Sequence, residues 1–99
     1  MEVSNTNNSW KIAAFYHFTK FSDYESWADR LVEHGLSVGL RGTIILAEEG
    51  INSTCAGSAE AIDRTIALIC SDKRFQSMEV KYSYADFCPF PKFKVKKKP

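Results

Sequence analysis

The hydrophobic positions of this chain recur with a strand period in four segments and with a helical period in two. Residues 10–18 are apolar on both alternating sides, which is typical of a strand inside a sheet. Residues 40–47 and 51–56 predict two further strands around a short turn, in which Gly50 stands where a tight hairpin often requires a positive φ. Residues 78–84 alternate apolar and polar positions, which predicts a strand with one wet or partner-facing side.

Two helices are predicted between these strands. The first is expected to begin at Ser22 and Glu25, which match a capping box, and to end at Gly35. The second is expected to begin at Ser58 and to end near residue 71. Its buried stripe consists of Ile62, Ile66 and Ile69, with help from Thr65 and Cys70. The order βαββαβ predicts an α+β ferredoxin-like sandwich, in which an antiparallel sheet carries both helices on one face.

The end of the chain differs from the rest. Pro89 and Pro91 interrupt regular backbone hydrogen bonding, and residues 92–96 then alternate lysine with apolar side chains. This segment is either a fifth strand at an edge of the sheet or a linker. The alternation stops abruptly at Pro99, so we expect the chain to be part of a longer protein. The predicted division is a flexible polar tail over residues 1–9, the ferredoxin-like domain over 10–88 and the Pro/Lys-rich strand or linker over 89–99.

Length and composition limit the class of protein. Ninety-nine residues, 44% of them hydrophobic and 25% charged, suit one globular domain with its own core. No apolar run reaches the ~18 residues that a membrane span needs. The N-terminus lacks the basic start and apolar stretch of a secretory signal. We therefore expect a soluble cytoplasmic protein with no membrane partner.

Charge is unevenly distributed along the chain, although the formal total is only +1. Residues 1–90 hold eight basic and twelve acidic side chains, a net charge of −4, whereas residues 91–99 hold five lysines and no acid, a net charge of +5. Such a basic end suits either contact with phosphates or a solvated strand edge. The candidate nucleic-acid-binding residues are Lys92, Lys94, Lys96, Lys97 and Lys98, with Arg41 and Lys81 as weaker candidates.

Side chains suited to catalysis or metal binding are scattered. The three cysteines are far apart, and Cys55 is expected to be a buried strand residue rather than a nucleophile in an anion-binding loop. His17 and His34 lie on different predicted elements. Adjacent Glu48 and Glu49 in a turn are expected to face water rather than to form a catalytic pair. We therefore predict no catalytic residue, no metal site and no cofactor in this chain.

Four segments carry a resemblance to a known family: Lys11-Ile-Ala-Ala-Phe-Tyr16, Gly39-Leu-Arg-Gly-Thr-Ile-Ile-Leu-Ala-Glu-Glu-Gly-Ile-Asn52, Ala56-Gly-Ser58 and Phe93-Lys-Val-Lys96. With them the chain resembles the N-terminal domain of the rhodanese-containing tRNA uridine hydroxylases, which modify the wobble uridine of tRNA. The resemblance implies an acylphosphatase-like ferredoxin fold, tRNA as a partner, and a parent that uses molecular oxygen. It also implies that the reactive cysteine lies in a rhodanese domain further along the parent. Cys55 matches a hydrophobic strand position of the family pattern and does not inherit that role.

Four functions remain open for the domain itself. It either helps to position tRNA or serves as a structural domain that packs on the rest of the parent, and we favour these two. An acylphosphatase-like hydrolase would use Asn52 to place water, but residues 19–23 offer neither a glycine-rich anion nest nor an arginine. An RNA-recognition module would stack bases on Tyr16 and Phe18, although residues 51–56 contain no aromatic side chain.

Overall fold

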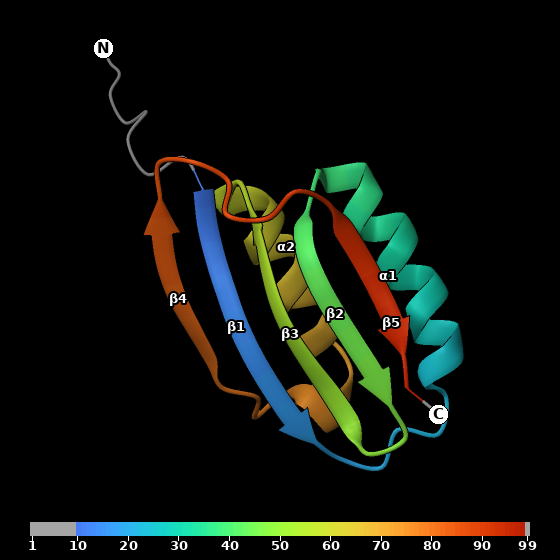
Figure 1. Cartoon of the computed structure of the whole chain (residues 1–99). Coiled ribbons are helices and arrows are strands. Elements are labelled where there is room, and N and C mark those ends of the chain that lie inside the picture. Colours follow the sequence, from blue (N-terminus) through green and yellow to red (C-terminus); the bar gives the residue numbers. More distant parts are fainter. Residues whose placement is uncertain (1–9, 99) are drawn as a thin grey trace.

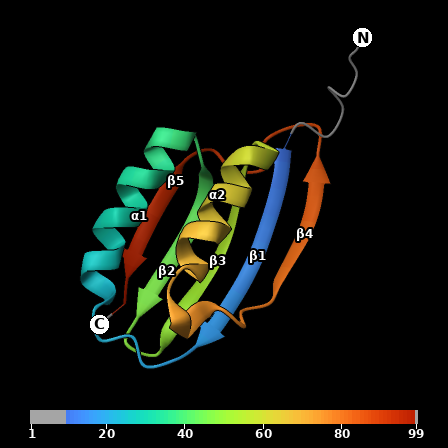
Figure 2. The same ribbon diagram turned by 180° about the vertical axis from the view of Figure 1, so that it is seen from behind.

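The protein is a two-layer sandwich of one five-stranded sheet and two helices, described by a computed structural model over residues 10–98. Both helices lie on the same face of the sheet, behind it in Figure 1 and in front of it in Figure 2. The elements in chain order are β1 (Trp10–Phe18), α1 (Tyr24–Val38), β2 (Arg41–Ala47), β3 (Gly50–Gly57), α2 (Ala59–Cys70), the short 3-10 helix η2 (Lys73–Phe75), β4 (Val80–Ala85) and β5 (Phe93–Lys97). This architecture confirms the predicted α+β ferredoxin-like sandwich.

The strands lie in the order β4-β1-β3-β2-β5, so β3 is the central strand and β1 and β2 flank it. β1 pairs antiparallel with β3 and with β4, and β2 pairs antiparallel with β3. The predicted fifth strand is present as β5, and it runs parallel to β2 because the segment after β4 crosses the end of the sheet (Figure 1). Backbone amides of Gly42 and Lys98 donate to the carbonyls of Lys92 and Leu46, which fixes both ends of this edge strand.

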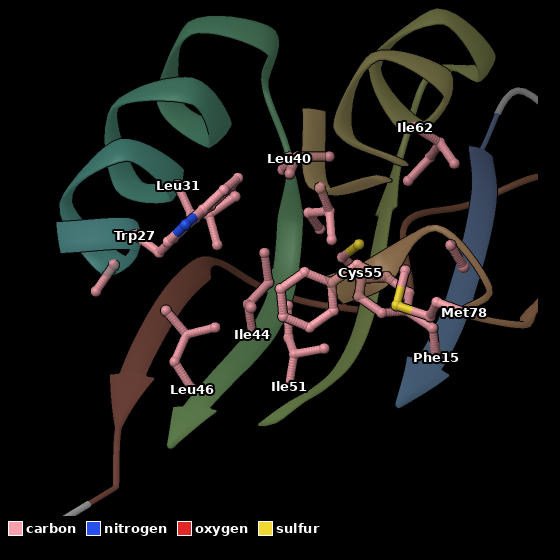
Figure 3. Close-up of a cluster of buried hydrophobic side chains, with 14 of the residues drawn as sticks. Phe15, Trp27, Leu31, Leu40, Ile44, Leu46, Ile51, Cys55, Ile62 and Met78 are labelled. Atoms are coloured by element: carbon pink, nitrogen blue, oxygen red, sulfur yellow. The ribbon is translucent and has the colours of Figure 1, made fainter. Parts of the chain in front are cut away.

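The hydrophobic core lies between the sheet and the helices (Figure 3). Alternate residues of the inner strands point into it, because successive side chains of a strand face opposite sides. Its buried side chains include the aromatic residues Phe15, Phe21, Trp27 and Phe75 and the aliphatic residues Leu31, Ile44, Leu46, Ile51, Ile62 and Ile69. Burial of one such side chain stabilises the fold by about 1.5–3 kcal/mol. Cys55 is fully buried among them, which confirms its expected packing role.

The hairpin between β2 and β3 confirms the glycine prediction. Ala47 pairs with Gly50, so Glu48 and Glu49 form the exposed turn. Gly50 has a φ of 142°, and a Cβ at this position would collide with the backbone carbonyl of His17. The hairpin turn therefore packs directly against the end of β1, where no other residue type fits without displacing the backbone.

The predicted ends of α1 were wrong. Its N-cap is Asp23 rather than Ser22, without a side-chain capping bond, because the Asp23 carboxylate accepts hydrogen bonds from Arg74 instead. At the other end the helix continues past Gly35 to Val38 and stops at Gly39, which has a φ of 75°. Gly35 is buried within the helix because the ring of Phe93 occupies the space of a Cβ.

The start of α2 agrees with the prediction. Ser58 is its N-cap, and the Ser58 hydroxyl accepts a hydrogen bond from the amide of Ala61 at 3.0 Å. The buried Thr65 hydroxyl donates to the carbonyl of Ala61 at 2.7 Å and lies 2.9 Å from Nε2 of His34. His34 is thus a half-buried contact between the two helices.

No helix within residues 10–98 is long and apolar enough to cross a membrane. The predicted flexible tail, residues 1–9, lies outside the described residues.

Candidate nucleic-acid interface

One face of the sheet carries no helix among the described residues, and this open face points toward the viewer in Figure 1. Strand register determines which side chains lie on it, because directly paired residues point to the same side. Tyr16 of β1 pairs with Asn52 of β3, and Ala14 pairs with Thr54 of β3 and with Lys81 of β4. The open face therefore combines aromatic, polar and basic side chains.

Two aromatic side chains stand on β1, next to the central strand of this face. Tyr16 is 65% exposed and Phe18 is 74% exposed, and their ring centroids are 5.7 Å apart with the planes tilted by 55°. Alternation along residues 10–18 places them on the side opposite the core residue Phe15. They contribute nothing to the hydrophobic core, so their exposure calls for another explanation.

A depression of about 650 Å³ lies beside these rings on the open face. Ala14 of β1 is one of its lining residues, and the small alanine side chain leaves space there. Asn52 and Thr54 line it from β3, and Ser77, Glu79 and Lys81 line it from β4 and the segment before it. The sequence prediction missed Thr54, although alternation along β3 places it on the same side as Asn52.

The predicted basic residues fall into two groups in the structure. Lys94 pairs with Thr43 and Lys96 with Ile45, which places both lysines on the open face at the β5 edge, opposite Lys81 on the β4 edge. Lys97 pairs with buried Leu46 and therefore points to the helix side.

Lys92 and Lys98 flank β5 as exposed residues, and the Arg41 guanidinium donates to the carbonyl of Pro91 at 2.9 Å. By strand register the open face therefore holds Lys81 of β4, Lys94 and Lys96 of β5, and also Arg41, which pairs with Ala56 on the side of Ile12.

The thiol of Cys55 and the imidazole of His34 lie away from the open face. Burial raises the pKa of the Cys55 thiol, which suppresses its thiolate. Desolvation lowers the pKa of His34, which favours its neutral form beside Thr65. Among residues 10–98 there is no group of three or more His, Cys, Asp or Glu side chains that could hold a metal ion.

The loop between β1 and α1 is where an acylphosphatase-like enzyme would hold its anion. Here the amides of Thr19 and Phe21 donate to the carbonyls of Glu49 and Glu48, at 3.0 and 2.8 Å. These two donors are therefore engaged with the acidic hairpin turn. An anion at this loop would also lie close to the two glutamates of that turn.

The layers, the strand order and the helix positions define an acylphosphatase-like α+β domain. An acylphosphatase from Coxiella burnetii has this fold, with a TM-score of 0.58 and 10% identity, over 97% of this chain and 100% of its own. BlrB, a BLUF protein in its dark state, has a TM-score of 0.68 and 15% identity, over 94% of this chain and 75% of its own. At such identities the similarity shows the fold alone.

The chain belongs to the UPF0176 acylphosphatase like domain family, whose model matches residues 10–99. Curated relatives named tRNA uridine(34) hydroxylase are 44% identical over 87% of this chain in Xylella fastidiosa (strain M23) and 43% identical over 91% in Wolbachia sp. subsp. Brugia malayi. A relative of the same name in Synechocystis sp. is 38% identical over 92% of this chain. The chain spans only about a third of their length: 34%, 34% and 33%. The family resemblance inferred from the sequence motifs is confirmed.

Proposed function

We propose that this chain is the N-terminal, non-catalytic domain of a tRNA wobble-uridine hydroxylase. The observation that carries this proposal is the 44% identity of 87% of the chain to one third of a tRNA uridine(34) hydroxylase. The parent is then a cytoplasmic, oxygen-dependent tRNA-modifying oxidoreductase. Its rhodanese domain, with the reactive cysteine, lies in the part of the relatives that this chain does not cover.

Within that parent, the open face helps to hold tRNA. Lys81 at one edge and Lys94 and Lys96 at the other can contact separate phosphates of one RNA. Such contacts give affinity without sequence readout, and they release counterions, which makes binding strongly dependent on salt. The positive charges lie around a polar and aromatic centre, which suits RNA better than an acidic protein surface.

A non-catalytic role agrees with the chemistry of the described residues. Cys55 is fully buried, and its raised pKa disfavours the reactive thiolate. The loop amides that an acylphosphatase-like mechanism would need are bonded to Glu48 and Glu49. Asn52 lies on the open face in β3, paired with Tyr16, rather than in that loop. A hydrolase function would require acyl phosphate hydrolysis by this chain that is lost in Asn52→Ala.

Charge reversal on the open face tests tRNA positioning. We expect Lys94→Glu combined with Lys96→Glu to weaken tRNA binding and to reduce the slope of log affinity against log salt by about 1 for each lost phosphate contact. Fluorescence anisotropy with labelled tRNA over a series of salt concentrations measures both quantities. The matched control is Lys73→Glu, which reverses a charge in η2 on the helix side. If the double variant and the control behave alike, the open face does not hold tRNA.

A second role is favoured by an exposed apolar pair on α1. Val32 and Leu36 are one helical turn apart and are 40% and 70% exposed. They suit contact with the rest of the parent, including its rhodanese domain. In the full-length parent we expect Leu36→Asp to increase protease cleavage between the domains, while tRNA binding by the 99-residue chain stays unchanged. Unchanged cleavage would argue against this contact.

A further inference from the structure

We propose that the depression on the open face binds the base of an unpaired ribonucleotide, which stacks on Tyr16 and Phe18. This inference rests on the proposed function, because it assigns the single-stranded part of a tRNA to the face that holds tRNA. It adds a base-binding subsite to a surface that would otherwise contact only phosphates.

The aromatic pair is the first observation. Large apolar side chains are normally buried, and an exposed pair on an interior strand stabilises the fold little. With centroids 5.7 Å apart and planes tilted by 55°, Tyr16 and Phe18 do not stack face to face, so each ring leaves area free for another ring. Stacking of a base on an aromatic side chain is largely independent of sequence, because every base has a π-face.

The shape beside the rings is the second observation. The depression is about 650 Å³, within the range of roughly 300–1,000 Å³ that pockets for small ligands occupy. Among its lining residues, the small Ala14 lies between Lys81 on one side and Thr54 on the other. A flat base can therefore enter next to the rings without displacing a bulky side chain.

Hydrogen-bonding groups line the same depression. Asn52 pairs with Tyr16 across the strands, and it makes no side-chain hydrogen bond to any other residue between 10 and 98. Its amide offers both a donor and an acceptor, which matches the edge of a base, and the Thr54 hydroxyl adds a second group. Polar groups at this position favour a nucleotide over an apolar peptide segment.

The charges around the depression indicate how the nucleotide lies. Lys81 supplies a cation for a phosphate on the β4 side, while neighbouring Glu79 repels phosphate and can accept a hydrogen bond from an amino group. Lys94 and Lys96 continue the positive charge at the opposite edge. A base inside a duplex is stacked between its neighbours and cannot reach these rings, so the site selects single-stranded RNA.

Binding of a fluorescent RNA tests the subsite. The probe is a short single-stranded RNA that contains a fluorescent adenine analogue, and the same strand annealed into a duplex serves as comparison. We expect Tyr16→Ala and Phe18→Ala each to weaken single-strand binding by about 5- to 100-fold and to reduce quenching of the analogue, with little effect on duplex binding. Tyr16→Phe keeps the ring and should bind like the wild type.

Tyr84→Ala is the matched control. Tyr84 is 56% exposed on the same sheet, but it pairs with Lys11 and therefore points to the helix side. Melting temperatures confirm that the variants fold, and little change is expected because the side chains removed are mostly exposed. Asn52→Ala is a second test, because it removes an exposed polar side chain and should change the preference among homopolymeric single strands.

Three results would overturn the subsite. Tyr16→Ala could bind the single strand as tightly as Tyr84→Ala does, or it could weaken single strand and duplex equally. It could also leave RNA binding intact and loosen domain association in the full-length parent, which would identify a protein as the occupant. If only the lysine reversals weaken tRNA binding, the subsite is wrong and the proposed function stands. If the wild type binds no RNA even at low salt, both are wrong.

Discussion

Gly39 and Gly50 both have a positive φ, but their surroundings differ. At Gly39, with a φ of 75°, there is open space where a Cβ would lie. At Gly50, with a φ of 142°, the carbonyl of His17 and the Cα of Phe18 occupy that space. Gly39 is thus required only by backbone conformation, whereas Gly50 is required by conformation and by close packing of the hairpin on β1.

Alanine substitutions separate these two requirements. We expect Gly39→Ala to cost about 1 kcal/mol, the strain of an L-residue in the left-handed region. Gly50→Ala should cost about 3 kcal/mol or more, because backbone atoms must also move. Urea denaturation of both variants measures the free energies of unfolding. Equal losses of unfolding free energy would mean that the backbone around Gly50 can shift at little cost. The close approach at Gly50 would then not contribute to the requirement for glycine.

At the scale of elements, Arg74 joins η2 to the start of α1. Its guanidinium donates hydrogen bonds to the carboxylates of Asp23 and Asp72. The distance is 2.6 Å from Nη1 to Oδ1 of Asp23 and 2.7 Å from Nη2 to Oδ2 of Asp72. The guanidinium also lies over the ring of Phe21, 4.9 Å from the centroid. Asp72 is close to Arg74 in sequence, whereas Asp23 and Phe21 are distant from it, and the bond to Asp23 explains why that side chain does not cap its own helix.

This connection predicts a stability change in acid. Hydrogen bonds from Arg74 lower the pKa of Asp72 from 3.8 to about 2, and they also lower the pKa of Asp23. Because the folded pKa lies below the unfolded one, the stabilisation is complete above about pH 5 and is lost as the pH falls from about 4 to about 2. Arg74→Ala should lower the free energy of unfolding by about 1 kcal/mol at neutral pH. It should also make that free energy depend less on pH between about 4 and about 2.

Arg64→Ala is the control for that measurement. Arg64 pairs with Glu60 along α2, but both side chains are mostly exposed, at 64% and 72%. Its removal should cost at most about 0.5 kcal/mol and leave the acid profile unchanged. If the profiles of wild type and Arg74→Ala have the same shape between pH 2 and 5 by urea denaturation, the connection does not stabilise α1.

At the scale of the whole molecule, local patterns were sufficient for the element order but not for the contacts between elements. The apolar side chains on both sides of residues 10–18 predicted β1, and the Ser58 cap predicted the start of α2. The misplaced end of α1 has a long-range cause, because Gly35 meets Phe93 of a strand that local patterns do not position. For the same reason the parallel pairing of β5 with β2 could not be predicted.

The candidate interface was predicted only in part, for a related reason. The basic residues were visible as an excess of lysine, but lysine counts do not tell which side of β5 each one faces. Register resolves this, since it places Lys94 and Lys96 on the open face and Lys97 on the other side. Tyr16 was visible as a candidate, whereas its position beside Asn52 depends on pairing between β1 and β3.

The central claim is that the open face of this domain holds RNA. The most direct measurement is an NMR titration of the isotope-labelled 99-residue chain with an anticodon stem-loop RNA at low salt. We predict the largest amide shift changes at Tyr16, Phe18, Asn52, Lys81 and Lys96, and their loss at high salt. Shift changes concentrated on α1 and α2, or no changes at any RNA concentration, would contradict the claim.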